Sequence, residues 1–177
     1  IEKHTNGEEE PGQTWIDLSG ESRDKPIVYG LAVANDAKYS YSFGTDEMAV
    51  TILKNSPYAH HDPAELDPEK EYAYVDHGVQ TFLYAMLPHV GSWKDSGILR
   101  TAQEINQRPV VLAETCHKGS LPQADSFINV DKGQVIVSAV KEAEDKDGIV
   151  IRAYETLKQS VDAEISLDFM GRKIRLH

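Results

Sequence analysis

Short apolar runs separated by turn residues recur along most of this chain, and this pattern is what most restricts its fold. The runs QTWIDL, PIVYGLAVAND and EMAVTILK are rich in Val, Ile, Leu, Thr and aromatic residues, which favour strands. Gly20, Pro26 and Gly44 lie in the gaps between them, where turns are expected. About ten such strands and one helix predict a mainly β protein, an antiparallel β-sandwich.

The C-terminal third shows the clearest strand signals. QVIVSAVKEAE and GIVIRAYETL are joined by Asp145-Lys146-Asp147-Gly148, which predicts a hairpin because Gly accepts the positive φ of a tight turn. Apolar and polar residues then alternate strictly from Val161 to Asp168, as in a strand with one wet face. VVLAE, after Pro109, and SFINV are two further predicted strands.

The stretch DHGVQTFLYAMLPH, residues 76–89, is the longest predicted strand. Apolar residues occupy both of its faces, which is typical of a core strand covered on both sides. His77 and His89 share a face, but twelve steps of about 3.3 Å place them roughly 40 Å apart in a continuous strand. One metal ion therefore cannot bind both.

One segment, DSGILRTAQEINQ, has helical spacing instead, because Ile98, Leu99, Ala102 and Ile105 recur on one side. Asp95 or Ser96 is its expected N-cap. Residues 1–12 are acidic and predict a flexible lead-in, and residues 55–77 hold several prolines and predict a long surface excursion. We expect residues 13–177 to form a single β-sandwich domain cut from a longer protein, since the chain starts at Ile1 without Met.

Composition excludes several classes of function. With 18 Lys and Arg against 29 Asp and Glu, the net charge of −11 repels a phosphate backbone, so we expect no nucleic-acid partner. No apolar run approaches the roughly 20 residues that span a bilayer, so we expect no membrane partner. Cys116 is the single cysteine and allows no internal disulfide. A soluble, cytoplasmic protein is expected.

The sequence contains no complete motif for catalysis or metal binding. His60, His61 and Asp62 form an HHD cluster, but no spaced His or Cys pair completes a tetrahedral metal site. Cys116 and His117 are adjacent and diverge in an extended chain, so we expect a buried or edge thiol rather than a nucleophile–base pair. The sequence identifies no carboxylate pair for glycoside hydrolysis, and it has no P-loop, GxGxxG or GxSxG motif. We therefore assign no catalytic residue and no metal ligand within this chain.

Asn35, Asp36 and Tyr39 are the candidate substrate-contact residues, because polar groups follow an apolar strand directly at this point. An amide, a carboxylate and a phenol at a strand end can bind sugar hydroxyls, with the ring against the apolar face of the sugar. The alternative is a hairpin turn in which Asn and Asp hydrogen-bond their own backbone.

Several sequence blocks, in order, resemble the C-terminal β-domain of family 38 glycoside hydrolases, the α-mannosidases. The blocks cover most of residues 13–168. They are WIDLSG (15–20), YGLAVANDAKYSY (29–41), DHGVQTFLYAMLPHVGSW (76–93), AQEINQRPV (102–110) and KEAEDKDGIVIRAYET (141–156).

The resemblance implies a galactose-mutarotase-like two-sheet β-sandwich with one short helix. It also implies a zinc-dependent retaining α-mannosidase, a hydrolase that removes terminal α-linked mannose from oligosaccharides. In that family the nucleophile, the acid/base and the zinc ligands lie in the N-terminal catalytic domain, and no block quoted above matches their motifs. The chain is therefore expected to carry no cofactor and to be inactive on its own, with the N-terminal domain of the same polypeptide and a mannose-containing oligosaccharide as partners. A homo-oligomer is one assembly compatible with the resemblance.

Two other functions remain open from the residues. An autonomous carbohydrate-binding module needs an aromatic platform, for which Trp15, Trp93 and the eight Tyr are available. The other is a plain scaffold domain without ligand contact. It differs from the α-mannosidase domain described above only in that Asn35, Asp36 and Tyr39 do not contact sugar.

Overall fold

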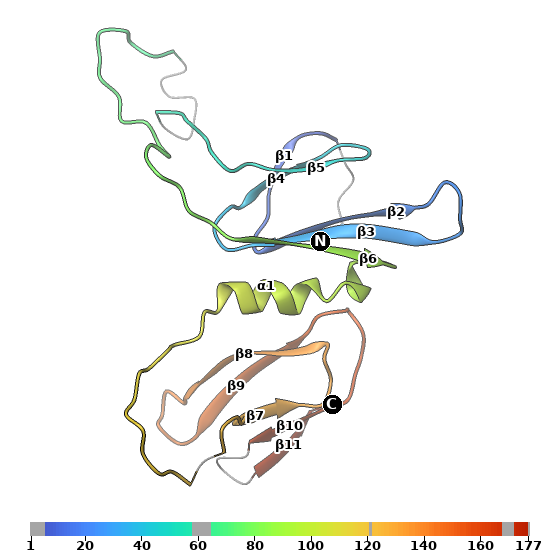
Figure 1. Cartoon of the computed structure of the whole chain (residues 1–177), viewed down its shortest axis with the longest axis vertical. Coiled ribbons are helices and arrows are strands. Elements are labelled where there is room, and N and C mark those ends of the chain that lie inside the picture. Colours follow the sequence, from blue (N-terminus) through green and yellow to red (C-terminus); the bar gives the residue numbers. More distant parts are fainter. Residues whose placement is uncertain (1–5, 58–64, 121, 168–171, 177) are drawn as a thin grey trace. The chain divides into compact units, whose positions relative to one another are not determined.

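The protein is mainly β, as predicted, and the strand pairs among its described residues are all antiparallel. The structure is a computed structural model that describes residues 6–57, 65–120, 122–167 and 172–176. Within these ranges it has eleven strands, one 3-10 helix and one α-helix (Figure 1). The strands are β1 (Glu9–Pro11), β2 (Trp15–Glu21), β3 (Val28–Asn35), β4 (Ser40–Phe43), β5 (Met48–Val50), β6 (Tyr84–Val90), β7 (Ile128–Val130), β8 (Val135–Glu142), β9 (Ile149–Glu155), β10 (Ala163–Leu167) and β11 (Arg172–Leu176); the helices are η1 (Trp93–Asp95) and α1 (Ile98–Asn106).

The chain divides into two compact units, Ile1–Val110 and Val111–His177. Each unit contains two sheets: β2-β3-β6 and β1-β4-β5 in the first, and β11-β10-β7 and β8-β9 in the second. The antiparallel β-sandwich class predicted from the strand pattern is confirmed. That residues 13–177 form one domain stays a prediction.

Helix α1 covers one face of the β2-β3-β6 sheet (Figure 1). The small residues Ala32 and Ala34 of β3 allow close approach and pack against Ile98 and Ala102 of the helix, all fully buried. Trp15, Leu87, Leu99 and Ile105 surround this cluster. The helix predicted from its apolar spacing is thus confirmed, and its apolar side lies on the sheet.

The start of α1 differs slightly from the predicted cap. Gly97 is its N-cap residue, in the left-handed region with φ of 71°, and makes no side-chain cap. The predicted Ser96 still contributes, because its Oγ accepts a hydrogen bond from the Ile98 N–H at 3.1 Å. Asp95 instead ends η1, where it forms a capping box with Ser92.

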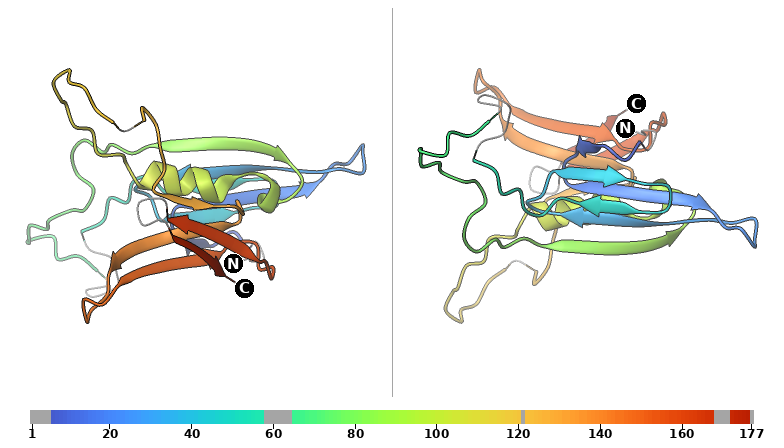
Figure 2. Two further views of the ribbon diagram at one scale, coloured as in Figure 1. Left: turned by 90° about the horizontal axis from the view of Figure 1, so that it is seen from below. Right: turned by 90° about the horizontal axis from the view of Figure 1, so that it is seen from above.

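The other face of the β2-β3-β6 sheet is covered by the β1-β4-β5 sheet, as the two views of Figure 2 show. Ile16 and Val33 pack there against Tyr41 of β4, which is 1% exposed. Strand β1 pairs with β4 and lies inside the predicted lead-in, so backbone pairing orders Glu9–Pro11 although little apolar surface is available there.

The predicted strand over residues 76–89 is wrong in its first half and in its burial. Strand β6 begins only at Tyr84, and Val79 before it is 96% exposed. Within β6 the exposure alternates, with Leu87 half-buried on the α1 side and Met86 and Val90 largely exposed on the other. The physical reason is that β6 is an edge strand whose outer face the β1-β4-β5 sheet does not cover.

Two other strand predictions are also wrong in extent. VVLAE forms no strand, and Val110, Val111 and Leu112 are each at least 85% exposed. In EMAVTILK only Met48–Val50 forms a strand. Both segments have strand-forming residues without a partner strand in the described parts of the chain. The predicted excursion over 55–77 is confirmed for residues 55–57 and 65–77, which contain no helix or strand.

The second unit contains the predicted hairpin. Strands β8 and β9 pair from Val135 opposite Glu155 to Glu142 opposite Ile149. The turn between them places Lys146 and Gly148 at positive φ. Strand β10 alternates as predicted, with Ala163, Ile165 and Leu167 buried. It pairs with β7 on one side and β11 on the other. No helix in the described residues is long and apolar enough to cross a membrane.

Candidate functional site at the end of strand β3

Asn35, the last residue of β3, forms the frame of the turn that follows it. Its side chain is 1% exposed, and its Oδ1 accepts hydrogen bonds from the N–H groups of Ala37 at 3.0 Å and Lys38 at 2.6 Å. Its Nδ2 donates to the Tyr41 hydroxyl at 2.6 Å. The amide is therefore engaged with the protein itself, which is the turn structure that the sequence left open as the alternative.

Tyr41 holds the far side of this turn. Its hydroxyl lies within hydrogen-bond distance of the Gln13 and Lys38 carbonyls. Burial raises the pKa of Tyr41, although the Asn35 amide acts in the opposite direction. The buried Asn35–Tyr41 pair thus positions the backbone of residues 36–40.

Asp36 connects this turn to two distant segments. Its Oδ1 accepts a hydrogen bond from the Leu83 N–H at 2.8 Å, and its Oδ2 lies 2.6 Å from the Arg108 guanidinium. The Leu83 hydrogen bond lowers the pKa of Asp36 most, and Arg108 lowers it further against the effect of burial. The carboxylate side chain is 11% exposed while that of Arg108 is 77% exposed, so the cation is the accessible member of the pair.

Tyr39 is the predicted contact residue that is open to solvent, with 53% of its surface exposed. Lys38 lies beside it, with Nζ 5.4 Å from the Phe82 ring centroid and 3.5 Å from Gln80 Oε1. Phe82 in turn packs against the exposed Tyr84, with ring centroids 6.2 Å apart. Lys38, Phe82 and Tyr84 thus form one cluster of ammonium and aromatic groups, and Tyr39 is exposed at the next position after Lys38.

The structure thus separates the three predicted residues. Asn35 and Asp36 have their polar atoms engaged in the turn, and only Tyr39 is presented to solvent. Sequence reasoning missed Phe82, Tyr84 and Arg108 as neighbours of this edge. Nothing in their local pattern indicates it, because the Asp36 hydrogen bonds that bring residues 83 and 108 here join segments 47 and 72 residues apart.

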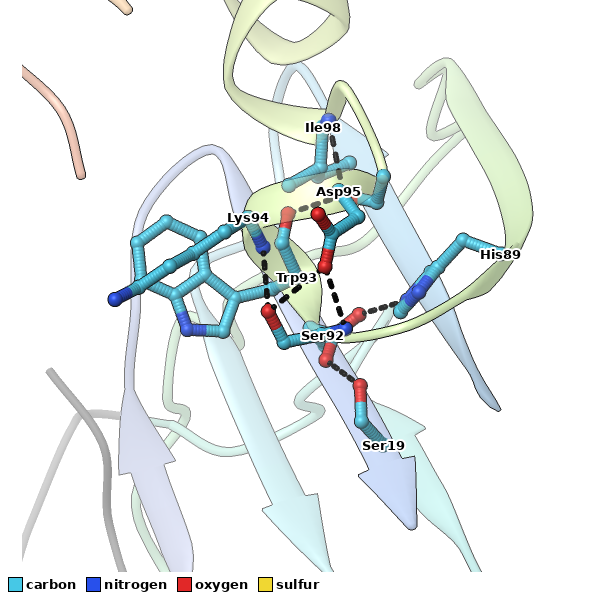
Figure 3. Close-up of polar contacts among 9 residues, drawn as sticks. Ser19, His89, Ser92, Trp93, Lys94, Asp95 and Ile98 are labelled. Atoms are coloured by element: carbon cyan, nitrogen blue, oxygen red, sulfur yellow. Dashed lines mark hydrogen bonds and ion pairs between the residues drawn. The ribbon is translucent and has the colours of Figure 1, made fainter. Parts of the chain in front are cut away.

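Asp17, Ser19 and His89 form a second polar cluster. Figure 3 shows Ser19 and His89 near Ser92 and Asp95 at η1. Nε2 of His89 lies 2.6 Å from Oδ2 of Asp17, and the Ser19 hydroxyl donates to Oδ1 of Asp17 at 2.5 Å. The side chains of His89 and Asp17 are only 5% and 6% exposed. The serine bonds the carboxylate and no bond joins it to the imidazole, so the cluster lacks the serine–histidine hydrogen bond of a nucleophile and its base.

The remaining candidates do not assemble a site. His77 stacks on Tyr74 and contacts Asn55 at 2.9 Å, whereas His89 contacts Asp17. Cys116 is exposed and lies in no strand, so the predicted buried or edge thiol is wrong.

Metal ligation finds no support in the part of the chain that the structure describes. No group of three His, Cys, Asp or Glu there is arranged to hold a metal ion. The HHD cluster of residues 60–62 lies outside the described residues. The described residues therefore do not fit a zinc site.

Comparison with known proteins now connects this fold to a family. Residues 134–176, which contain most of the second unit's strands, match the family described as "Glycosyl hydrolases family 38 C-terminal beta sandwich domain". Alpha-mannosidase G of Dictyostelium discoideum is 29% identical over 82% of this chain and 12% of its own length. Alpha-mannosidase 2C1 of Homo sapiens is 28% identical over 86% of this chain and 13% of its own. The Alpha-mannosidase of Saccharomyces cerevisiae is 26% identical over 72% of this chain and 12% of its own. No solved structure matches.

The observed strands and sheets agree with the β-sandwich fold of the matching family domain. The resemblance seen in the sequence is confirmed, because residues 134–176 match the C-terminal β-sandwich domain of family 38 and most of the chain is similar to the alpha-mannosidases named above. The chain spans 12–13% of the length of the curated relatives named here.

Proposed function

We propose that this chain is a non-catalytic C-terminal domain of a zinc-dependent retaining α-mannosidase, which hydrolyses terminal α-linked mannose from oligosaccharides. The observation that carries the proposal is that relatives named alpha-mannosidases match 72–86% of the chain with 12–13% of their own length. The catalytic carboxylates and the zinc ligands then belong to the N-terminal domain of the same polypeptide. We place that polypeptide in the cytoplasm, since Cys116 is the single cysteine of this chain and no internal disulfide stabilises it.

The test compares the complete polypeptide with the isolated 177-residue chain on an aryl α-mannoside, with and without a zinc chelator. We expect turnover only by the complete polypeptide and loss of that turnover on chelation. Proton NMR of the first-formed sugar should show the α-anomer, as retention requires. Turnover by the isolated chain would disprove the non-catalytic role.

Tyr39 is the residue we propose to contact the sugar, because it is the exposed member of the three strand-end candidates. Asn35 and Asp36 hold the turn that carries it. In the complete enzyme, Tyr39→Ala should raise KM for a manno-oligosaccharide about tenfold with kcat unchanged, as expected for a group that binds substrate and transition state equally. Tyr154→Ala, at a tyrosine that is 50% exposed on β9, is the matched control and should leave KM unchanged.

A carbohydrate-binding module is the second candidate, and the Phe82–Tyr84 pair beside Lys38 favours it. Such a cluster can act as an aromatic platform for a sugar ring. Calorimetric titration of the isolated chain with mannose and α-mannobiose separates the two candidates. Millimolar or tighter binding that is lost in Tyr84→Ala supports the module, and absence of heat supports the domain role.

A further inference from the structure

The turn that follows β3 gathers two cations from distant parts of the sequence. Lys38 belongs to the turn itself, where its backbone N–H donates to Asn35 Oδ1 at 2.6 Å. Arg108 is 72 positions from Asp36 and reaches the turn through the 2.6 Å contact between its guanidinium and Asp36 Oδ2. Both cations therefore lie at one turn of a chain whose net charge is −11.

The guanidinium of Arg108 keeps donors for a ligand. The Arg108 side chain is 77% exposed and that of Asp36 is 11% exposed, so the cation of this pair faces solvent. One terminal nitrogen contacts Asp36, and the described residues provide no hydrogen-bond acceptor for the other two nitrogens. A guanidinium has five N–H groups in a planar fork that matches a carboxylate or a phosphate. Arg108 is therefore available to an anionic group from solvent.

Lys38 provides the second cation and has no carboxylate partner among the described residues. Its Nζ lies 3.5 Å from Gln80 Oε1 and 5.4 Å from the centroid of the Phe82 ring. Neither the amide nor the ring carries a charge, so neither neutralises the ammonium group. An anion that binds Arg108 can therefore also be attracted by Lys38.

Two aromatic rings lie beside these cations. Phe82 and Tyr84 flank Leu83 in the sequence, and their ring centroids are 6.2 Å apart. Asp36 holds this segment as well as Arg108, because its Oδ1 accepts a hydrogen bond from the Leu83 N–H at 2.8 Å. Tyr84 is 57% exposed, so part of its ring is open to a ligand. An aromatic ring can pack against the apolar face of a sugar.

This combination of groups fits a sugar ring that carries a negative charge. A neutral sugar gains little from an exposed cation, whereas hydrogen bonds between two charged groups are about twice as strong as neutral ones. A nucleic acid extends beyond the turn and is repelled by the acidic chain as a whole. A single anionic group interacts mainly with charges within about 8 Å, the screening length at physiological ionic strength.

We propose that the end of β3 binds mannose units that carry a phosphate or a carboxylate. The Phe82–Tyr84 pair contacts the sugar ring, and Arg108 and Lys38 contact the anionic group. The proposal rests on the proposed function, in which this edge of the domain contacts sugar. It makes Arg108 the residue that selects charged over neutral mannose units.

Calorimetric titration of the complete polypeptide tests the proposal with mannose, mannose 6-phosphate, mannuronate and inorganic phosphate. None of these probes has a glycosidic bond, so no heat of turnover enters the titration. We expect at least one charged sugar to bind about tenfold more tightly than mannose, and this advantage should decrease as salt is added. The charged sugar with the lower Kd identifies the preferred anionic group. Inorganic phosphate should bind about tenfold more weakly than that sugar, because it has no ring to contact the aromatic pair.

Arg108→Gln should remove the advantage of the charged sugar, and unchanged affinity for mannose shows that the variant is folded. Arg108→Lys keeps the charge without the planar fork and should retain part of the advantage. Arg100→Gln is the matched control, because the Arg100 side chain is 81% exposed and also contacts a carboxylate, that of Glu104 at 3.5 Å. It should leave all four affinities unchanged.

Lys38→Gln should reduce the advantage of the charged sugar in the same direction. Lys94→Gln is its control, since Lys94 Nζ lies 5.7 Å from the centroid of the Trp93 ring and so has a similar aromatic contact. Equal affinity for mannose and both charged sugars overturns the proposal. So does an equal loss in Arg100→Gln and Arg108→Gln, or inorganic phosphate that binds as tightly as the charged sugars.

This outcome is separable from catalysis, which is measured on the aryl α-mannoside. If the complete polypeptide shows no α-mannosidase activity but selects charged sugars through Arg108, the proposed function fails and the anionic site stands. If activity is present and Arg108→Gln changes no affinity, the anionic site fails and the proposed function stands.

Discussion

Nε2 of His89 lies 2.6 Å from Oδ2 of Asp17, although the two residues are 72 positions apart and come from the two outer strands of the β2-β3-β6 sheet. The contact crosses β3, and it does so over Gly30, which is the cross-strand partner of both Ser19 and His89. Because Gly30 has no side chain, the imidazole of His89 can reach over the middle strand β3. Nδ1 of His89 is buried and has no hydrogen-bond partner among the described residues, so Asp17 provides the contact that orients the ring.

Breaking this pair should destabilise the fold, because each change leaves a buried polar group without its partner. Asp17→Ala and His89→Ala should each lower the free energy of unfolding by about 1–3 kcal/mol. Their double variant should cost less than the sum of the two, with a coupling free energy of about 0.5–3 kcal/mol. Urea denaturation followed by circular dichroism measures all four proteins. Strict additivity of the two single changes would show that the contact contributes nothing.

Gly30→Ala should be destabilising for a different reason, which is steric. A Cβ at this position would lie 2.5 Å from Ser19 Oγ, 2.7 Å from the Leu18 carbonyl oxygen and 2.8 Å from His89 Cε1. Since one of these atoms belongs to the backbone, the sheet itself must shift, at a cost of about 1–3 kcal/mol.

Gly20→Ala is the matched control, since a Cβ there meets no atom within 4 Å although Gly20 lies in the neighbouring strand β2. It should be neutral or stabilising by about 0.5 kcal/mol. Comparable urea midpoints for the two variants would contradict the steric account of Gly30.

Elements whose partners lie close in the sequence were predicted well. The Asp145–Gly148 turn specified the β8-β9 hairpin, and the spacing of Ile98, Ala102 and Ile105 specified α1. Both signals are local, because one fixes a turn geometry and the other fixes one side of a helix. The Asn35 turn was likewise among the alternatives that the sequence left open.

Strand-like segments without a neighbour were predicted wrongly. Val110–Leu112 and residues 76–83 have the composition of strands, but strand propensity reflects a fit to a paired and partly covered surface. Neither segment forms a strand in the described part of the chain. The pairings of Asp36 with Leu83 and Arg108, and of His89 with Asp17, could not be predicted because they depend on which strands become neighbours.

Asp36 should make stability depend on pH in the acid range. In the folded protein the pKa of Asp36 is lower than its ordinary value of 3.8. As pH falls below that value, the unfolded chain therefore binds more protons than the folded protein does. The stabilising contribution is fully present above pH 3.8 and is lost as pH decreases through the folded pKa. Asp36→Asn should therefore flatten the dependence of unfolding free energy on pH below about 4.

Arg108→Gln tests the order of the two causes. It should reduce the acid dependence without removing it, because the Leu83 N–H hydrogen bond has the larger effect on the Asp36 pKa. If Arg108→Gln abolished the dependence as completely as Asp36→Asn, the ion pair rather than the backbone hydrogen bond would be the main cause.

Tyr41 gives the corresponding prediction at alkaline pH. Burial raises its pKa above 10.0, so its contribution to stability is fully present below pH 10 and is lost as pH rises through the folded pKa. Tyr41→Phe should remove that alkaline loss. At neutral pH the same variant should lower the free energy of unfolding by about 1–3 kcal/mol, because the Asn35 amide loses its acceptor inside the protein.

Tyr39→Phe is the control for Tyr41→Phe. The Tyr39 hydroxyl is 3.5 Å from the Asp36 carbonyl and its ring is half exposed, so the variant should change the free energy of unfolding by less than about 0.5 kcal/mol. Urea titrations at pH 7 and 10.5, with phenolate absorbance as a second signal, measure both variants. An unchanged alkaline dependence in Tyr41→Phe would show that another group titrates.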